Sequence, residues 1–168
     1  MISKSLRGPQ YYDTTIKIGT MDTHFKLDTG SPISIISIGS LARLFNLPDS
    51  DLYRYISSID QKHVTFASYG GKTNDFYKLR FSNVSLEDEL VSPLFLYLST
   101  VYNNINLLGY DIISNFRHVT GDIKVLNFYD FDLESYYRND IFKSIEPIEI
   151  SELSFMKSNP LLDAINLM

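Results

Sequence analysis

The 168-residue chain contains no cysteine, only 3 histidines and no long apolar run. Disulfides, thiol catalysis and cysteine-ligated zinc are therefore excluded. The histidines, His24, His63 and His118, lack the spacing of a metal site, so we expect no bound metal. The densest apolar stretch, residues 94–98, has the length of a strand and falls far short of the roughly 20 residues of a membrane span. The N-terminus does not resemble a secretory signal, and we expect a cytoplasmic protein.

Charge is unevenly distributed along the chain. Residues 1–129 contain 12 acidic and 12 basic side chains, whereas residues 130–168 contain 8 acidic and 3 basic ones, so the tail accounts for the whole net charge of -5. No basic stripe of the kind that binds nucleic acid is present. A solvated acidic appendage is the simplest interpretation of the tail, and an interaction segment is the alternative.

Alternating apolar and polar residues predict a fold built mostly of strands, and the 12 tyrosines and 11 phenylalanines favour the same class. The pattern predicts one hairpin over residues 12–27 and a second over 64–81 with a Gly-Gly tip. Residues 49–62 show no clear pattern. Further strands are expected at 83–86, 90–99, 105–108 and 122–128, and short helices at 40–47 (stopped by Pro48), 110–116, 133–145 and 161–167.

An apolar strand leads directly into Asp28-Thr29-Gly30-Ser31, a motif that suggests chemistry. Peptide hydrolysis by carboxylates requires two of them facing one water, one accepting its proton while the other, protonated, polarises the carbonyl. Gly30 would let the backbone approach the carboxylate, and the hydroxyls of Thr29 and Ser31 would brace the loop. Asp-Thr-Gly alone also occurs by chance, and an aspartate in an ordinary Asx turn is the competing interpretation.

Two ordered segments give the motif a context. Residues 27–36 read Leu-Asp-Thr-Gly-Ser-Pro-Ile-Ser-Ile-Ile, and Leu107-Leu108-Gly109-Tyr110-Asp111 follows much later. Together they resemble the active-site segment and the second signature of the retropepsin-type aspartic proteases, the family of retroviral and retrotransposon proteases and their cellular relatives. The resemblance spans residues 10–130. The longer, helix-containing stretch at 37–62 is more similar to the cellular DNA-damage-inducible-type relatives than to the compact viral enzymes.

The resemblance implies an all-β fold, a closed acid-protease β-barrel subunit with one or two short helices. Residues 10–130 would form this domain, with an N-terminal arm at 1–9 and an acidic extension at 131–168. A flap closing over an extended peptide would be formed by Ala67, Ser68, Tyr69, Gly70 and Gly71. The second signature, Leu107, Leu108, Gly109 and Asp111, would be structural: Gly109 would let its strand pass close behind the active-site loop, and Asp111 would cap the helix that follows.

The chain contains one Asp-Thr-Gly and no Asp-Ser-Gly, so it supplies half of a catalytic pair. Two-fold pairing would bring Asp28 beside Asp28 of a second copy, because it sets the same residue next to itself. Asp111 and Asp122 lack the strand-to-turn setting of Asp28. We therefore expect a homodimeric aspartic endopeptidase that acts on peptide or protein substrates without a cofactor. The alternative is an inactive fold that serves as a dimerisation or peptide-binding module.

Two other motifs carry less weight. Gly71-Lys72-Thr73 suggests a phosphate-binding loop, but Phe66 stands where that loop requires a glycine. Ser31 and Ser34 are not part of a Gly-x-Ser-x-Gly elbow, and we expect them to brace or pack rather than attack a substrate.

Overall fold

The computed structural model describes residues 2–7, 11–58, 63–67, 73–86, 89–90, 93–99, 105–121 and 125–150. Strands predominate in these residues, which confirms the predicted all-β fold class. The strands are β1 (Ile2–Arg7), β2 (Tyr11–Ile18), β3 (Met21–Leu27), β4 (Ile35–Ile36), β5 (Val64–Ala67), β6 (Thr73–Phe81), β7 (Val84–Leu86), β8 (Glu89–Leu90), β9 (Leu94–Ser99), β10 (Leu107–Leu108), β11 (Phe116–Gly121), β12 (Val125–Phe131) and β13 (Ile148–Glu149). The helices are α1 (Ile38–Phe45), α2 (Asp49–Ser58), α3 (Tyr110–Ile113) and α4 (Leu133–Arg138).

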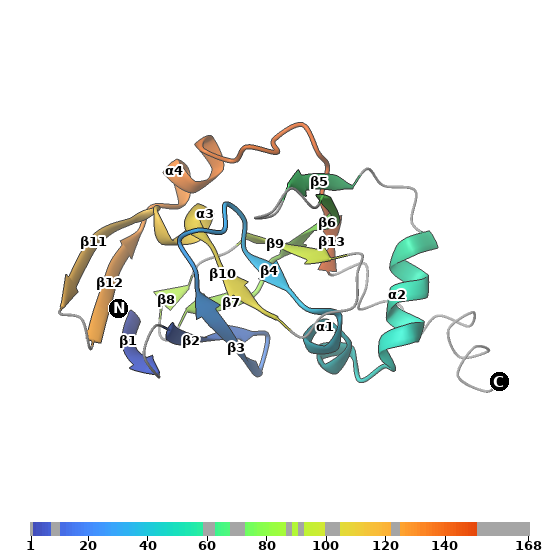
Figure 1. The fold of residues 1–168 in the computed structure, drawn as a ribbon, viewed down its shortest axis with the longest axis horizontal. Coiled ribbons are helices and arrows are strands. Elements are labelled where there is room, and N and C mark those ends of the chain that lie inside the picture. The colour runs from blue at the N-terminus through green and yellow to red at the C-terminus, as the bar shows by residue number, and fades with distance from the viewer. Residues whose placement is uncertain are drawn as a thin grey trace.

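The strands form one curled sheet in the order β11-β12-β1-β2-β3-β10-β4-β9-β6-β13 (Figure 1). β5 pairs with β6, and β7 pairs with β2 and β8. Most neighbours are antiparallel, but β10 runs parallel to β3, β4 to β9 and β13 to β6. The β3–β10 pairing brings the strand before Asp28 beside the second signature, although the two lie far apart in the sequence.

Both predicted hairpins are present. β2 and β3 pair from Asp13↔Lys26 to Ile18↔Met21, and Gly19 takes the positive φ of 63° that the turn requires. β5 and β6 pair from Val64↔Phe76 to Ala67↔Thr73. The expected flap tip, Ser68, Tyr69, Gly70 and Gly71, lies outside the described residues.

Two helices occupy the stretch between β4 and β5. α1 begins after Ser37, whose hydroxyl accepts a hydrogen bond from the Ser40 amide, and ends before Asn46 in the left-handed conformation. The predicted helix is therefore confirmed, but it starts earlier and Asn46, rather than Pro48, ends it. α2 was not predicted, because it buries only Leu52 and Ile56, a narrow apolar stripe at one i, i+4 spacing.

The larger of two hydrophobic clusters in the described residues joins the curled sheet to these helices. Leu41, Leu52 and Ile56 are fully buried and belong to the same cluster as Phe25 and Phe81 of the sheet. Each such side chain contributes about 1.5–3 kcal/mol when it leaves water. The core thus fixes β3, which carries Asp28 at its end, against a rigid support.

The two ends of the described chain are also structured. Residues 2–7, expected as an arm, form β1 and pair with β12 from Ile2↔Phe128. The tail folds as far as residue 150: Tyr136 is 4% and Ile148 is 3% exposed. The solvated interpretation of the tail is therefore wrong for residues 131–150. A helix lies within the predicted range 133–145, whereas the one expected at 161–167 lies outside the described residues. No helix in the described part is long and apolar enough to cross a membrane.

Candidate active site

Asp28 directly follows β3, where the apolar strand enters a turn, and its side chain is exposed. Its Oδ1 accepts a hydrogen bond from the Gly30 amide at 3.0 Å. This contact is an Asx turn, so the competing sequence interpretation describes part of the geometry. Among the described residues nothing donates to Oδ2. One carboxylate oxygen thus orients the side chain while the other stays available to a water or a substrate.

The loop after Asp28 is tied at both ends to the second signature. The Asp28 amide donates to the Leu108 carbonyl at 2.9 Å, and the Tyr110 amide donates to the Ser31 carbonyl at 2.7 Å. The Ser31 hydroxyl donates to the Ile33 carbonyl at 2.7 Å, which braces the loop. The Thr29 hydroxyl is exposed and makes no hydrogen bond within the described part of the chain, so bracing by Thr29 stays a prediction.

Two glycines of this arrangement lie close to other atoms, and one of them, Gly109, leaves no room for a side chain. A Cβ on Gly30 would lie 3.2 Å from Asp28 Oδ1, which is tighter than an ordinary contact. A Cβ on Gly109 would lie 2.3 Å from the Ile33 carbonyl oxygen and 2.7 Å from that of Ser31. Those atoms belong to the backbone and cannot rotate away. Gly109 therefore allows the second signature to pass against the active-site loop, as the sequence suggested.

Ser34 and Asp111 form the strongest polar link between the two segments. Asp111 Oδ1 accepts from the Ser34 hydroxyl at 2.7 Å, and Oδ2 accepts from the Ser34 amide at 3.1 Å. The Ser34 hydroxyl also accepts from the Gly109 amide at 2.8 Å. The N-cap of α3 is Gly109, so Asp111 is not the capping residue, although its Oδ1 accepts from the Ile112 amide at 2.9 Å. Its carboxylate instead holds a residue 77 positions away in the chain.

Burial raises the pKa of Asp111 to about 6, and the negative charge of Asp140 acts in the same direction. The hydrogen bonds from Ser34 and Ile112 lower the pKa of Asp111 but do not compensate for burial. The carboxylate that connects the two signatures is therefore ionised at neutral pH and protonated under mildly acidic conditions.

Comparison with known proteins bears on this geometry. No protein-family model matches the chain, and no curated protein matches it in sequence. The crystal structure of a retropepsin-like aspartic protease from Rickettsia conorii is similar, with a TM-score of 0.57 and 15% identity over 76% of this chain and 89% of that chain. The chain has a retropepsin-like fold. This likeness concerns the fold alone.

Within the retropepsin-like fold, Asn106 supports the active-site strand in a way that the sequence did not indicate. Its Nδ2 donates to the His24 carbonyl at 3.0 Å and to Ser40 Oγ at 2.8 Å, and its Oδ1 accepts from the Ser37 amide at 2.7 Å. The residue thus joins β3 to the start of α1. An asparagine before a short apolar strand gives no sequence signal of such a role.

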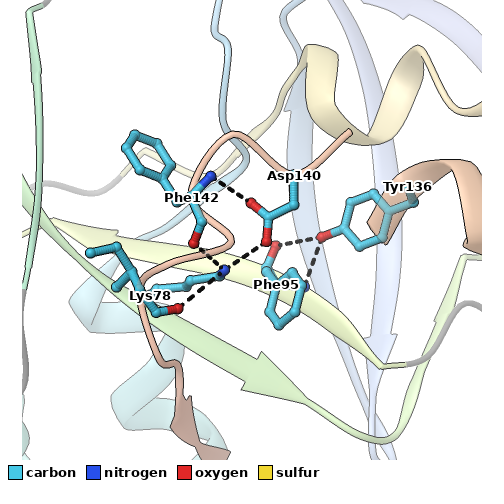
Figure 2. A network of polar contacts seen from close by, with 6 residues as sticks. Lys78, Phe95, Tyr136, Asp140 and Phe142 are labelled. Carbon is cyan, nitrogen blue, oxygen red and sulfur yellow. Dashed lines mark hydrogen bonds and ion pairs between the residues drawn. The ribbon is translucent and has the colours of Figure 1, made fainter. Parts of the chain in front are cut away.

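The tail is attached to β6 through a buried lysine (Figure 2). Lys78 Nζ donates to Asp140 Oδ2 at 2.7 Å, to the Phe142 carbonyl at 2.9 Å and to the Ile145 carbonyl at 3.4 Å. Its ammonium also lies 4.3 Å from the centre of the Phe95 ring. The lysine side chain is 2% exposed and that of Asp140 is 11% exposed. The tail is therefore held on β6 by an ion pair that solvent hardly reaches, and the retropepsin-like sheet continues into the tail where β13 pairs with β6.

Several predicted site residues stay untested by these contacts. Ala67 ends β5, which places it at the start of the expected flap. Leu107 and Leu108 pair with Lys26 and Leu27 and thus support the strand before Asp28. No group of three or more histidine, aspartate or glutamate side chains in the described part of the chain could hold a metal ion.

Proposed function

We propose that this chain is one subunit of a homodimeric aspartic endopeptidase, with Asp28 of each copy forming a catalytic pair. The observation that carries the proposal is Asp28 itself. It follows a core strand in a retropepsin-like fold, its Oδ1 accepts a hydrogen bond from the Gly30 amide, and the residue is exposed. The chain has no second Asp-Thr-Gly, so a complete pair requires a second copy.

The chemistry follows from two carboxyl groups that face one water. They share a proton, because two adjacent carboxylates resist simultaneous ionisation. The ionised one accepts a proton from the water while the protonated one polarises the peptide carbonyl. The hairpin of β5 and β6 would lie over an extended substrate, and its tip, around Ala67 to Gly71, would exclude bulk water. No cofactor is needed for these steps.

The test combines cleavage with mass. Purified protein is incubated with a peptide library at pH 4–7, and its mass is measured by sedimentation. Cleavage that disappears in Asp28→Asn supports the proposal, and an Asp28→Asn protein as active as wild type would contradict it. Asn is the matched variant because it keeps an acceptor for the Gly30 amide. A stable dimer that cleaves no peptide would favour the inactive peptide-binding alternative.

A further inference from the structure

A pocket of about 360 Å³ lies beside the active-site loop. Pro32 and Ile33, which follow Asp28-Thr29-Gly30-Ser31, form one wall. Other walls come from Tyr97 of β9, from Asp111 of α3, and from Asp140 and Ile141 of the tail. The tail thus completes a pocket that the fold up to residue 130 would leave open on one side.

The polar chemistry of the pocket is acidic. Two carboxylates, Asp111 and Asp140, line it, and no lysine or arginine does so in the described part of the chain. The three N–H groups of the Lys78 ammonium donate to Asp140 and to the carbonyls of Phe142 and Ile145, so no N–H group is left for a ligand. Asp111 accepts three hydrogen bonds and Asp140 accepts two, from Lys78 and the Phe142 amide. A carboxylate can accept about four, so both retain capacity for a donor.

Tyr97 supplies an independent sign of a missing ligand. Its side chain lines the pocket and the residue is only 2% exposed, yet its hydroxyl has no hydrogen-bond partner among the described residues. Tyr97 lines the same pocket as Asp140 and Asp111, and burial together with their negative charges raises the pKa of its hydroxyl. Buried hydroxyls in native proteins nearly always have a partner. The phenol oxygen is therefore available to accept an N–H from a ligand in the pocket.

We propose that this pocket binds a lysine or arginine side chain of the peptide substrate and thereby sets specificity. The idea rests on the proposed function, because Pro32 and Ile33 join the pocket wall to the Asp28 loop. An ammonium or guanidinium group supplies the N–H donors that Tyr97, Asp111 and Asp140 can still accept. The aromatic walls suit the alkyl stem or guanidinium plane of such a side chain. An acidic side chain would face two carboxylates, and an apolar one would leave the Tyr97 hydroxyl unpaired.

The experiment compares matched peptides that differ at one position. Library peptides cleaved by the wild type are resynthesised with lysine replaced by norleucine and arginine by citrulline, at each basic position in turn. We expect kcat/KM to fall about tenfold or more at one position, the size of one lost hydrogen bond to a charged group. Tyr97→Phe, which loses no hydrogen bond within the described residues, should reduce that preference several-fold.

A second variant tests the charge of the pocket. Ile141 is 65% exposed, so Ile141→Lys brings a positive charge to the pocket without burying it. It should weaken cleavage of the basic peptides more than cleavage of their norleucine and citrulline analogues. Ser57→Lys is the charge-matched control: Ser57 is exposed at the end of α2, on the far side of the molecule from α4 (Figure 1), and the preference should persist.

Failure of this idea is separable from failure of the proposed function. Equal cleavage of basic and neutral peptides would overturn the pocket assignment and leave the peptidase standing. If the wild type cleaves nothing, the peptidase proposal fails. Binding of N-acetyl-arginine amide and of its citrulline analogue, measured by calorimetry, then tests whether the pocket prefers a basic side chain. Saturable binding of the arginine compound that Ile141→Lys abolishes would support the pocket. Equal or absent binding of the two compounds would refute it.

Discussion

The buried ion pair between Lys78 and Asp140 offers a sharp test of how the tail is held. Lys78→Met keeps the length of the side chain but removes the ammonium. Asp140, 11% exposed, would lose its counter-ion, and the carbonyls of Phe142 and Ile145 would lose a donor. Removing one partner of a buried pair costs about 3–5 kcal/mol. Since a domain of this kind is stable by only about 5–15 kcal/mol, we expect a large fall in the urea midpoint.

Arg80→Met is a matched control on the same strand. Arg80 pairs with Glu149 of the tail at 2.8 Å, but the two side chains are 39% and 31% exposed. Exposed pairs contribute about 0–1 kcal/mol, so the same loss of a positive charge should scarcely change stability. The contrast between Lys78 and Arg80 therefore isolates burial as the cause.

The measurement is urea unfolding followed by circular dichroism at one protein concentration. The double variant Lys78→Met/Asp140→Asn removes both charges, and it should recover about 2 kcal/mol or more of the single-variant loss, because no unpaired charge stays buried. A loss below about 1 kcal/mol for Lys78→Met would refute the reasoning. A double variant no more stable than the single one would show that packing, rather than charge, holds the tail.

Three further predictions concern Asp28 and the second signature. Gly109→Ala should lower the free energy of unfolding by about 1–3 kcal/mol and abolish cleavage, because the new Cβ would lie 2.3 Å from the Ile33 carbonyl oxygen. The control, Gly19→Ala, has a φ of 63° and open space around it, so it should lower the free energy of unfolding by only about 1 kcal/mol and leave cleavage intact. Urea unfolding and a peptide-cleavage assay measure both variants. The pKa of Asp111 is raised to about 6 from 3.8, so the free energy of unfolding of the wild type should fall by up to about 3 kcal/mol relative to that of Asp111→Asn as the pH rises from about 4 to about 6. A difference in unfolding free energy that does not change with pH would contradict this. Mixed dimers of wild type with Asp28→Asn should be inactive, and mixed dimers as active as wild type would exclude a shared pair.

Local patterns predicted several features of the candidate site that the structure describes. The alternation of residues 12–27 predicted β2 and β3, and the turn chemistry at Asp28 predicted where the strand ends. Glycine at 109 was expected to permit a close approach, and the backbone contacts of Ser31 and Ile33 agree. Each of these features depends on residues that are adjacent in the sequence or on the absence of a side chain at one glycine, so the sequence alone predicts them.

Long-range partners were not predictable in the same way. The bond between Ser34 and Asp111 joins residues 77 positions apart, and Asn106 reaches Ser37 and His24 across similar distances. α2 was missed because Leu52 and Ile56 alone form its fully buried stripe. β11 was missed because its residues 117–120 are all exposed, so no buried face alternates with a solvent face. In each case tertiary packing, rather than local preference, decides the outcome.

The tail shows most clearly why charge composition was misleading. An acidic segment suggests solvation only while its partners are unknown, and here Asp140 and Glu149 find Lys78 and Arg80 on one strand, β6. That strand pairs with β5 from Thr73 to Phe76, and with β13 at Leu79 and Arg80. The tail therefore holds the C-terminal half of β6, at Leu79 and Arg80. The N-terminal half, residues 73–76, forms one strand of the hairpin that is expected to be the flap. By pairing with β6 at Leu79 and Arg80, the acidic tail would position the hairpin that we propose as the flap. The tail also supplies Asp140 and Ile141 to the pocket that Pro32 and Ile33 line.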